Sequence, residues 1–267
     1  MWWRSVGLKA FYDQWRATLG MAVFVAAYAG LILAIFPSIS SIIEIRDIFN
    51  KLPEAFRAAS APAGVDITTP EGYIATEFFS LIGPLLFFAY TIAIGGSATA
   101  GEEERGTIDM LMALPIPRWR VLLEKFAGLV IGTAVIACAL LAGMALGGLA
   151  AGLQLRLDGV AAIIASAALL TTLFGALAMW IGALSGRRTF SIGLAFALAV
   201  GSYFVYSFSA LVEVIKPARP FSPLTYYIGD NPLVNGLRFA DVAVLAGVTV
   251  VFVVLALVAF QRRDLRV

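Results

Sequence analysis

Six apolar runs, each long enough to cross the roughly 30 Å hydrocarbon core of a bilayer, constrain the fold of this chain more than any other feature. Because backbone polar groups in lipid must be satisfied within their own segment, spans of this kind are predicted to be helices. The sequence therefore predicts an all-α polytopic membrane protein, with one transmembrane domain over residues 1–267. We expect its spans at residues 19–39, 78–100, 121–153, 160–184, 190–212 and 242–260.

The composition agrees with lipid as the solvent. Hydrophobic residues make up 61% of the chain, charged residues only 13%, and the mean hydropathy is +0.91. A water-soluble domain of this length needs far more polar surface to cover one core. The formal net charge of +2, without a dense basic tract, argues against a nucleic-acid partner.

Histidine is absent from the chain, and Cys138 is the only cysteine. Without histidine the chain cannot build Ser-His-Asp or Cys-His nucleophile systems, or any histidine-ligated metal site. No G-x-x-x-x-G-K-[ST] loop or other nucleotide fingerprint occurs either. We therefore expect no enzyme activity, no catalytic residues, no cofactor and no metal on this chain. If the protein does work driven by ATP, a partner must bring the ATPase.

Positive charges indicate the orientation of the spans. With the N-terminus inside, the inner segments and the start of the third span hold twelve of the 19 Lys and Arg residues: Arg4, Lys9, Arg16, Arg105, Arg118, Arg120, Lys125, Arg187, Arg188, Arg262, Arg263 and Arg266. The outer loops are longer in total and hold the remaining seven. Because cytoplasmic loops carry an excess of Lys and Arg, both termini are predicted to be cytoplasmic.

The segments outside the spans carry weaker patterns. Apolar and aromatic side chains recur at helical spacing along one face of residues 1–18, at Leu8, Phe11, Tyr12 and Trp15. This pattern predicts an amphipathic helix in the cytoplasmic headgroup layer, although an aromatic belt with positive-inside charges explains the same residues. Residues 40–77 are expected to form short helices on the outer bilayer surface, followed by a polar turn region marked by Pro62, Gly64, Pro70 and Gly72. The proline-rich loop 213–239 is expected to be irregular or built of short re-entrant pieces.

The inner loop after the second span differs from the other loops. It opens with three carboxylates at residues 102–104, which the macrodipole favours at a helix N-terminus. A short apolar stripe at helical spacing and a stop follow: Ile108, Leu111, Met112 and then Pro115. The pattern predicts a cytoplasmic helix over residues 102–114 that can dock in a groove of another protein. A solvated turn whose acids offset the basic flank is the alternative.

The string GEEERGTIDMLMALPIPRWRVLLEKF, at residues 101–126, resembles the signature loop of the type-2 ABC exporter permeases (ABC-2 family). That loop reads E-x-E-x-G-T, then L-L-x-x-P, then basic residues and a lysine. The chain supplies Glu102, Glu104, Gly106, Thr107, Leu111, Pro115, Arg118 and Lys125 in this order, with Met112 where leucine is usual. Residues 222–227 and 231–233 resemble the family's proline-containing outer loop, and residues 262–265 resemble its common ending.

The resemblance implies a coupling helix that contacts a separate ABC ATP-binding subunit, which carries ATP and magnesium. The implied docking residues are Glu102, Glu103, Glu104, Arg105, Gly106, Thr107, Ile108, Leu111 and Met112. Of the three acids we favour Glu104 as the ATPase contact, because it lies one turn before Ile108. The resemblance also implies export, a second permease subunit (identical or different), and a bacterial or archaeal cytoplasmic membrane.

Three G-x-x-x-G pairs lie in or near the spans: Gly128 and Gly132, Gly143 and Gly147, and Gly182 and Gly186. Close helix packing within one subunit explains them, as does a dimer seam or a translocation path. Almost no ionisable residue lies within the spans, which disfavours an ion-coupled carrier. A stand-alone secondary transporter, a channel and a membrane scaffold are the alternative functions, and the substrate is left open.

Overall fold

The structure is a computed structural model that describes residues 6–40, 69–104, 117–209 and 211–262. Every regular element within these residues is a helix, which confirms the predicted all-α class. Most of the first outer loop, and residues 105–114 of the predicted coupling helix, lie outside the described residues.

Five helices are long and apolar enough to cross a membrane: α1 (Val6–Ser40), α8 (Arg118–Ala150), α9 (Leu157–Ser185), α10 (Arg188–Ser209) and α13 (Phe239–Arg262). The sixth span is broken. Its outer part is α4 (Pro70–Ile74) continued by the π-helix η1 (Ala75–Phe79), and its inner part is α5 (Ile82–Ser97), bent from the outer part by 42°. These helices correspond in order to the six predicted spans.

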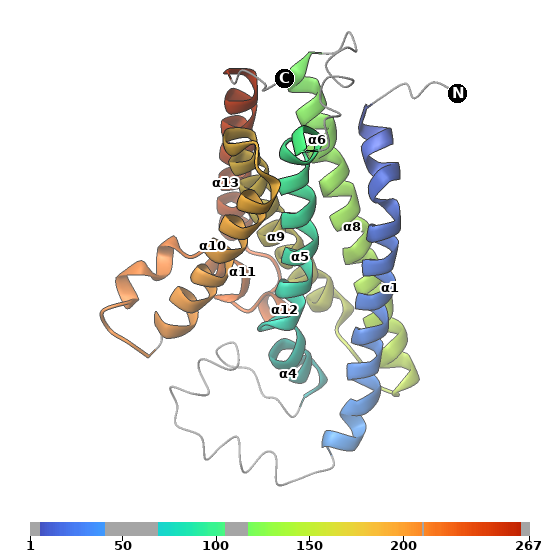
Figure 1. The fold of residues 1–267 in the computed structure, drawn as a ribbon. Coiled ribbons are helices and arrows are strands. Elements are labelled where there is room, and N and C mark those ends of the chain that lie inside the picture. Colours follow the sequence, from blue (N-terminus) through green and yellow to red (C-terminus); the bar gives the residue numbers. More distant parts are fainter. Residues whose placement is uncertain (1–5, 41–68, 105–116, 210, 263–267) are drawn as a thin grey trace.

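The beginning of α1, the end of α13 and the short helix α6 (Ala100–Glu104) lie at one end of the bundle (Figure 1). This arrangement agrees with a topology in which both ends of the bundle's chain lie on one side of the membrane; that this side is cytoplasmic stays a prediction, and we call this end the inner end. The amphipathic segment predicted at residues 1–18 is continuous with the first span, because α1 runs without a break from Val6. Thr18 joins this part of α1 to α5: its hydroxyl lies 2.8 Å from the Tyr90 hydroxyl.

Helix α9 is the centre of the bundle. In its most apolar stretch 72% of the residues are buried, against 17% for α10 and 22% for α13. It packs against α5, α13, α10 and α8. Its contact with α5 is a backbone approach, since a Cβ placed on Gly95 would lie 2.0 Å from the Gly175 carbonyl oxygen. Only a residue without a side chain allows the two helices to come this close.

The glycines of α8 pack against α1 within the same chain. A Cβ on Gly143 would lie 2.4 Å from the Ala26 carbonyl oxygen, and one on Gly147 would lie 2.7 Å from the Gly30 Cα. For this pair, close packing within one subunit is therefore the correct interpretation. Gly186 has a different role, because its left-handed φ of 62° ends α9.

The loop between α10 and α13 contains three short helices: the 3₁₀ helix η2 (Lys216–Phe221), α11 (Leu224–Ile228) and α12 (Pro232–Asn235). Helices α11 and α12 pack on α9. A Cβ on Gly159, in the first turn of α9, would lie 2.0 Å from the Leu233 carbonyl oxygen. The loop is thus built of short helices, the second of its two predicted forms, and α11 and α12 pack into the protein; that they re-enter the membrane stays a prediction.

Candidate functional site at the inner end of span two

The candidate site is built around α6, the short helix that carries the three acids after α5. The chain interrupts its helix between the two elements, at Ala98 and Thr99. In a continuous helix the Glu102 N–H would reach the Ala98 carbonyl, but here it donates to the Thr99 carbonyl at 3.1 Å. The Ala98 oxygen is therefore open to a donor from another part of the chain.

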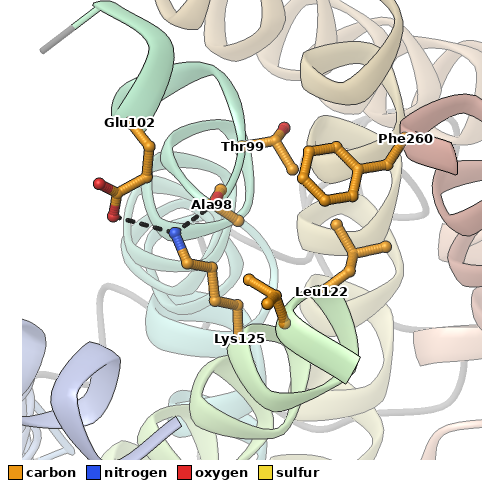
Figure 2. A pocket seen from close by; sticks show the side chains of 7 residues that line it. Ala98, Thr99, Glu102, Leu122, Lys125 and Phe260 are labelled. Carbon is orange, nitrogen blue, oxygen red and sulfur yellow. Dashed lines mark hydrogen bonds and ion pairs between the residues drawn. The ribbon is translucent and has the colours of Figure 1, made fainter. Parts of the chain in front are cut away.

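Lys125, in the second turn of α8, supplies that donor. Its side chain is buried, and its ammonium group donates to the Ala98 carbonyl oxygen at 2.6 Å and to Glu102 Oε1 at 3.0 Å (Figure 2). The apolar stem of the lysine passes beside Leu122, and Phe260 of α13 lies across the same pocket. A buried ammonium group requires partners of this kind. We call Lys125, Ala98 and Glu102 the inner clamp.

Glu104 contacts a different span. Its Oε1 accepts the backbone N–H of Arg188, the first residue of α10, at 2.8 Å. A carboxylate at this position satisfies an N–H that the helix leaves without a partner and complements the helix dipole. The Arg188 side chain returns to α5, where its Nε donates to Ser97 Oγ at 2.8 Å. The end of α5 and the short helix α6 are thus joined to both α8 and α10.

A comparison with known protein families decides the class of the chain. A family model described as "ABC-2 family transporter protein" matches residues 8–265, nearly the whole chain. The chain belongs to the ABC-2 family. It is accordingly a multi-pass membrane protein and a permease subunit of an ABC transporter, as the loop motif, the outer loop and the tail together indicate. A search of curated proteins finds no match to the chain.

Within this ABC-2 permease the three acids have unequal surroundings. Glu102 and Lys125 form an ion pair in which the Glu102 side chain is 26% exposed and the Lys125 side chain 6%. Glu104 is exposed, and Glu103 is half-buried. Although the sequence favours Glu104 as the contact of a partner ATPase, one of its carboxylate oxygens is engaged within the chain. A contact between its exposed carboxylate and an ATPase stays a prediction.

The remaining predicted docking residues lie outside the described residues: Arg105, Gly106, Thr107, Ile108, Leu111 and Met112. The predicted helix over residues 102–114 is therefore described only at its beginning, where Glu102–Glu104 are helical. Among the described residues, no three His, Cys, Asp or Glu side chains lie close enough together to hold a metal ion.

Two members of the site have no clear signal in the sequence. Arg188 is visible there only as one of the inner-side charges, and Ser97 only as a small polar residue near a span end. The Gly186 that ends α9 is the one indication that a new helix N-terminus follows. The arrangement as a whole can transmit force, because a displacement of α6 pulls on α8 through Lys125 and on α10 through Arg188.

Proposed function

We propose that this permease is the membrane subunit of an exporter in which a separate subunit binds and hydrolyses ATP. The observation that carries the proposal is the inner clamp, which joins the loop with the docking motif to α8 by two hydrogen bonds of a buried ammonium group. A loop that only connected two spans would not require a buried charge. A loop that receives force from a partner benefits from a stiff, charge-assisted connection to the spans.

In the proposed mechanism the ATPase binds the segment that begins at Glu102, and ATP binding and hydrolysis on that subunit displace it. Helix α6 then moves with the segment. Its two connections pass the displacement to α8 and α10, which rock relative to the rest of the bundle and expose the path first to one side and then to the other. The permease contributes binding and movement, and the ATPase contributes the chemistry together with its magnesium ion.

The working unit is proposed to contain two permease subunits, identical or different, and two ATPase subunits in a bacterial or archaeal cytoplasmic membrane. The exposed aromatic face of α10 supports a surface for lipid or for a second permease: Phe190 is 55% exposed, Phe204 51% and Phe208 42%. Large apolar side chains on an exposed face require an apolar partner or a lipid environment.

The test is co-purification of the permease with the ATPase encoded by a neighbouring reading frame. We expect the wild-type chain to retain the ATPase and to raise its ATP hydrolysis. Glu104→Arg with Ile108→Asp reverses one charge of the docking segment and replaces an apolar side chain of its stripe with a carboxylate, so the retained ATPase should fall at least about tenfold. The control makes the corresponding charge changes at the outer end, Glu213→Arg with Val214→Asp, where Val214 is 88% exposed.

The two sets of variants separate the alternatives. An ATPase retained equally by both double variants would contradict the docking proposal. A wild-type permease that neither retains the ATPase nor raises its activity would contradict ATP-driven export itself. Transport that follows an ion gradient and ignores ATP depletion would then identify a carrier or channel, and the absence of any transport would identify a scaffold.

A further inference from the structure

The outer end of span two contains a second break in the helix. The π-helix η1 ends at Phe79, and α5 begins at Ile82 after Leu81, whose φ of −143° lies outside the helical range. To continue the π pattern, the Phe79 carbonyl would need an N–H from the residue five positions later. That residue is Pro84, which has no N–H. A buried carbonyl without a donor is costly at membrane depth, so another part of the chain must supply one.

Tyr227 of α11 supplies the donor. Its hydroxyl donates to the Phe79 carbonyl oxygen at 2.9 Å, across 148 positions of sequence. The Tyr227 side chain is 1% exposed, and Phe78 and Phe79 are fully buried. The backbone carbonyl oxygen of Tyr227 accepts a hydrogen bond from the Ser166 hydroxyl of α9 at 3.0 Å. Tyr227 thus lies between the broken span and the central helix, with a hydrogen bond to each.

We propose that Tyr227 is a positioning residue for transport, and that its hydrogen bond to Phe79 holds the outer part of span two closed against α11, which Ser166 joins to α9. We call Tyr227, Phe79 and Ser166 the outer latch. The outer part of span two (Pro70–Phe79) is short and meets α5 at the bend. It also contacts α1 and the Arg156 N–H, which donates to Glu71 Oε1 at 3.3 Å. In the proposed opening it moves while α5 stays packed on α9. Release of the latch frees this outer part, and the outer face opens. The transport role rests on the proposed function, whereas the closure itself rests on these contacts alone.

Two neighbouring tyrosines provide a matched pair of variants. Tyr227→Phe removes only the hydroxyl of the latch and keeps the buried ring. Tyr226→Phe removes a hydroxyl that donates to the Pro220 carbonyl at 3.0 Å at the exposed surface of the same loop. Both changes delete one oxygen, one residue apart, but only the first removes the donor to the broken span.

The measurement is the rate at which a membrane-impermeant maleimide labels a reporter thiol at the bend. The reporter is Ser80→Cys, at a half-buried position directly after Phe79, in a Cys138→Ala background. The chain is reconstituted in lipid nanodiscs with its co-purified ATPase. Without ATP, Tyr227→Phe should raise the labelling rate about threefold to tenfold, as expected for one lost hydrogen bond in a membrane protein. Tyr226→Phe should label at the wild-type rate.

ATP provides the second arm of the experiment. ATP should accelerate labelling of the wild-type complex, and it should add less in Tyr227→Phe, where the outer part is already released. The KM for ATP should be unchanged, because ATP binds on the partner. A merely structural role would not reduce the ATP response while leaving that KM intact. Labelling of Tyr227→Phe at the wild-type rate without ATP, or a full ATP response, would overturn the proposal.

Ser166→Ala is a second test of the outer latch, for use if Tyr227→Phe does not fold. It leaves the Tyr227 hydroxyl in place and removes the donor to its carbonyl, so labelling should rise in the same direction by a smaller factor. If Tyr227→Phe cannot be purified and Ser166→Ala labels at the wild-type rate, the proposal is wrong. Failure of the proposed function gives a different result, because the wild-type chain then retains no ATPase. The labelling rates of wild type and Tyr227→Phe in nanodiscs without ATP still test whether the outer latch keeps the outer part closed.

Discussion

At each end of span two the helix is broken, and a backbone carbonyl at the break accepts a hydrogen bond from a distant side chain. The two donors differ in their chemistry. At the inner end the Ala98 carbonyl accepts the ammonium group of Lys125, and at the outer end the Phe79 carbonyl accepts the hydroxyl of Tyr227. Both donors come from distant parts of the chain. The inner donor is charged, and its ammonium group also pairs with the Glu102 carboxylate, whose side chain is 26% exposed. The outer donor is neutral and buried.

The difference indicates which end can respond to a partner. A charge-assisted contact beside a partly exposed carboxylate is sensitive to any charged surface that docks there. A neutral hydrogen bond within the protein is insensitive to distant charges and breaks only when its two groups move apart. We infer that the inner clamp receives the signal and that the outer latch follows it mechanically, through α5.

The largest effect is expected where α5 meets α9, because both ends depend on that contact. Gly95→Val would place a Cβ about 2.0 Å from the Gly175 carbonyl oxygen, so the helices must separate. Overpacking of this kind should cost about 3 kcal/mol of stability and raise the labelling of Ser80→Cys. Thermal unfolding in detergent measures the loss. Gly193→Val is the control, since nothing lies within 4 Å of a Cβ there; equal stability of the two variants would contradict the prediction.

The next effect separates the two ends. Lys125→Met keeps the apolar stem and removes both donated hydrogen bonds, which leaves the Glu102 carboxylate partly buried and without its cation. We expect a loss of about 2 kcal/mol and a fall in ATPase stimulation. Labelling at the outer bend should be unchanged without ATP, and its acceleration by ATP should be reduced.

Arg120→Met is the matched control, because Arg120 pairs with Glu124 on the same helix with a side chain 54% exposed. An exposed pair of this kind contributes about 0.5 kcal/mol or less. If Arg120→Met were as damaging as Lys125→Met, the effect would reflect the net charge of the inner surface and the inner clamp would have no special role.

The spans could be predicted from the sequence because hydropathy is a local property. The predicted span 160–184 corresponds to a helix at Leu157–Ser185, and the predicted span 121–153 to one at Arg118–Ala150. Span two is the exception, since it begins at Pro70 and the prediction places its start at residue 78. A local signal was present: Thr69 caps this helix by accepting the Gly72 N–H at 3.0 Å, and Pro70 follows the cap.

The partners within the site could not be predicted from one sequence. Lys125 is visible as an ionisable residue at the inner edge of a span, and Tyr227 as part of the proline-containing outer loop. Their acceptors are backbone carbonyls, which every residue carries, and they are released by breaks in span two that hydropathy does not reveal. Knowing which carbonyl lacks a donor requires the path of the backbone, so the inner clamp and the outer latch emerge only from the structure.

The smallest expected effect concerns pH and again separates the two ends. Burial, together with the nearby Tyr206, raises the pKa of the Tyr227 phenol well above its ordinary value of 10.0. The folded protein therefore keeps the hydroxyl protonated, while the unfolded chain ionises it above about pH 10.

The contribution of Tyr227 to stability is complete below pH 10 and is lost as the pH rises above it. At about pH 10.5 the loss is at most on the order of 1 kcal/mol for this one group. Unfolding temperatures at about pH 8 and about pH 10.5 should therefore fall further apart in the wild-type chain than in Tyr227→Phe, with Tyr226→Phe behaving as wild type. An equal fall in wild type and Tyr227→Phe would mean that the phenol is not buried at equilibrium, and the distinction between a neutral outer end and a charged inner end would no longer hold.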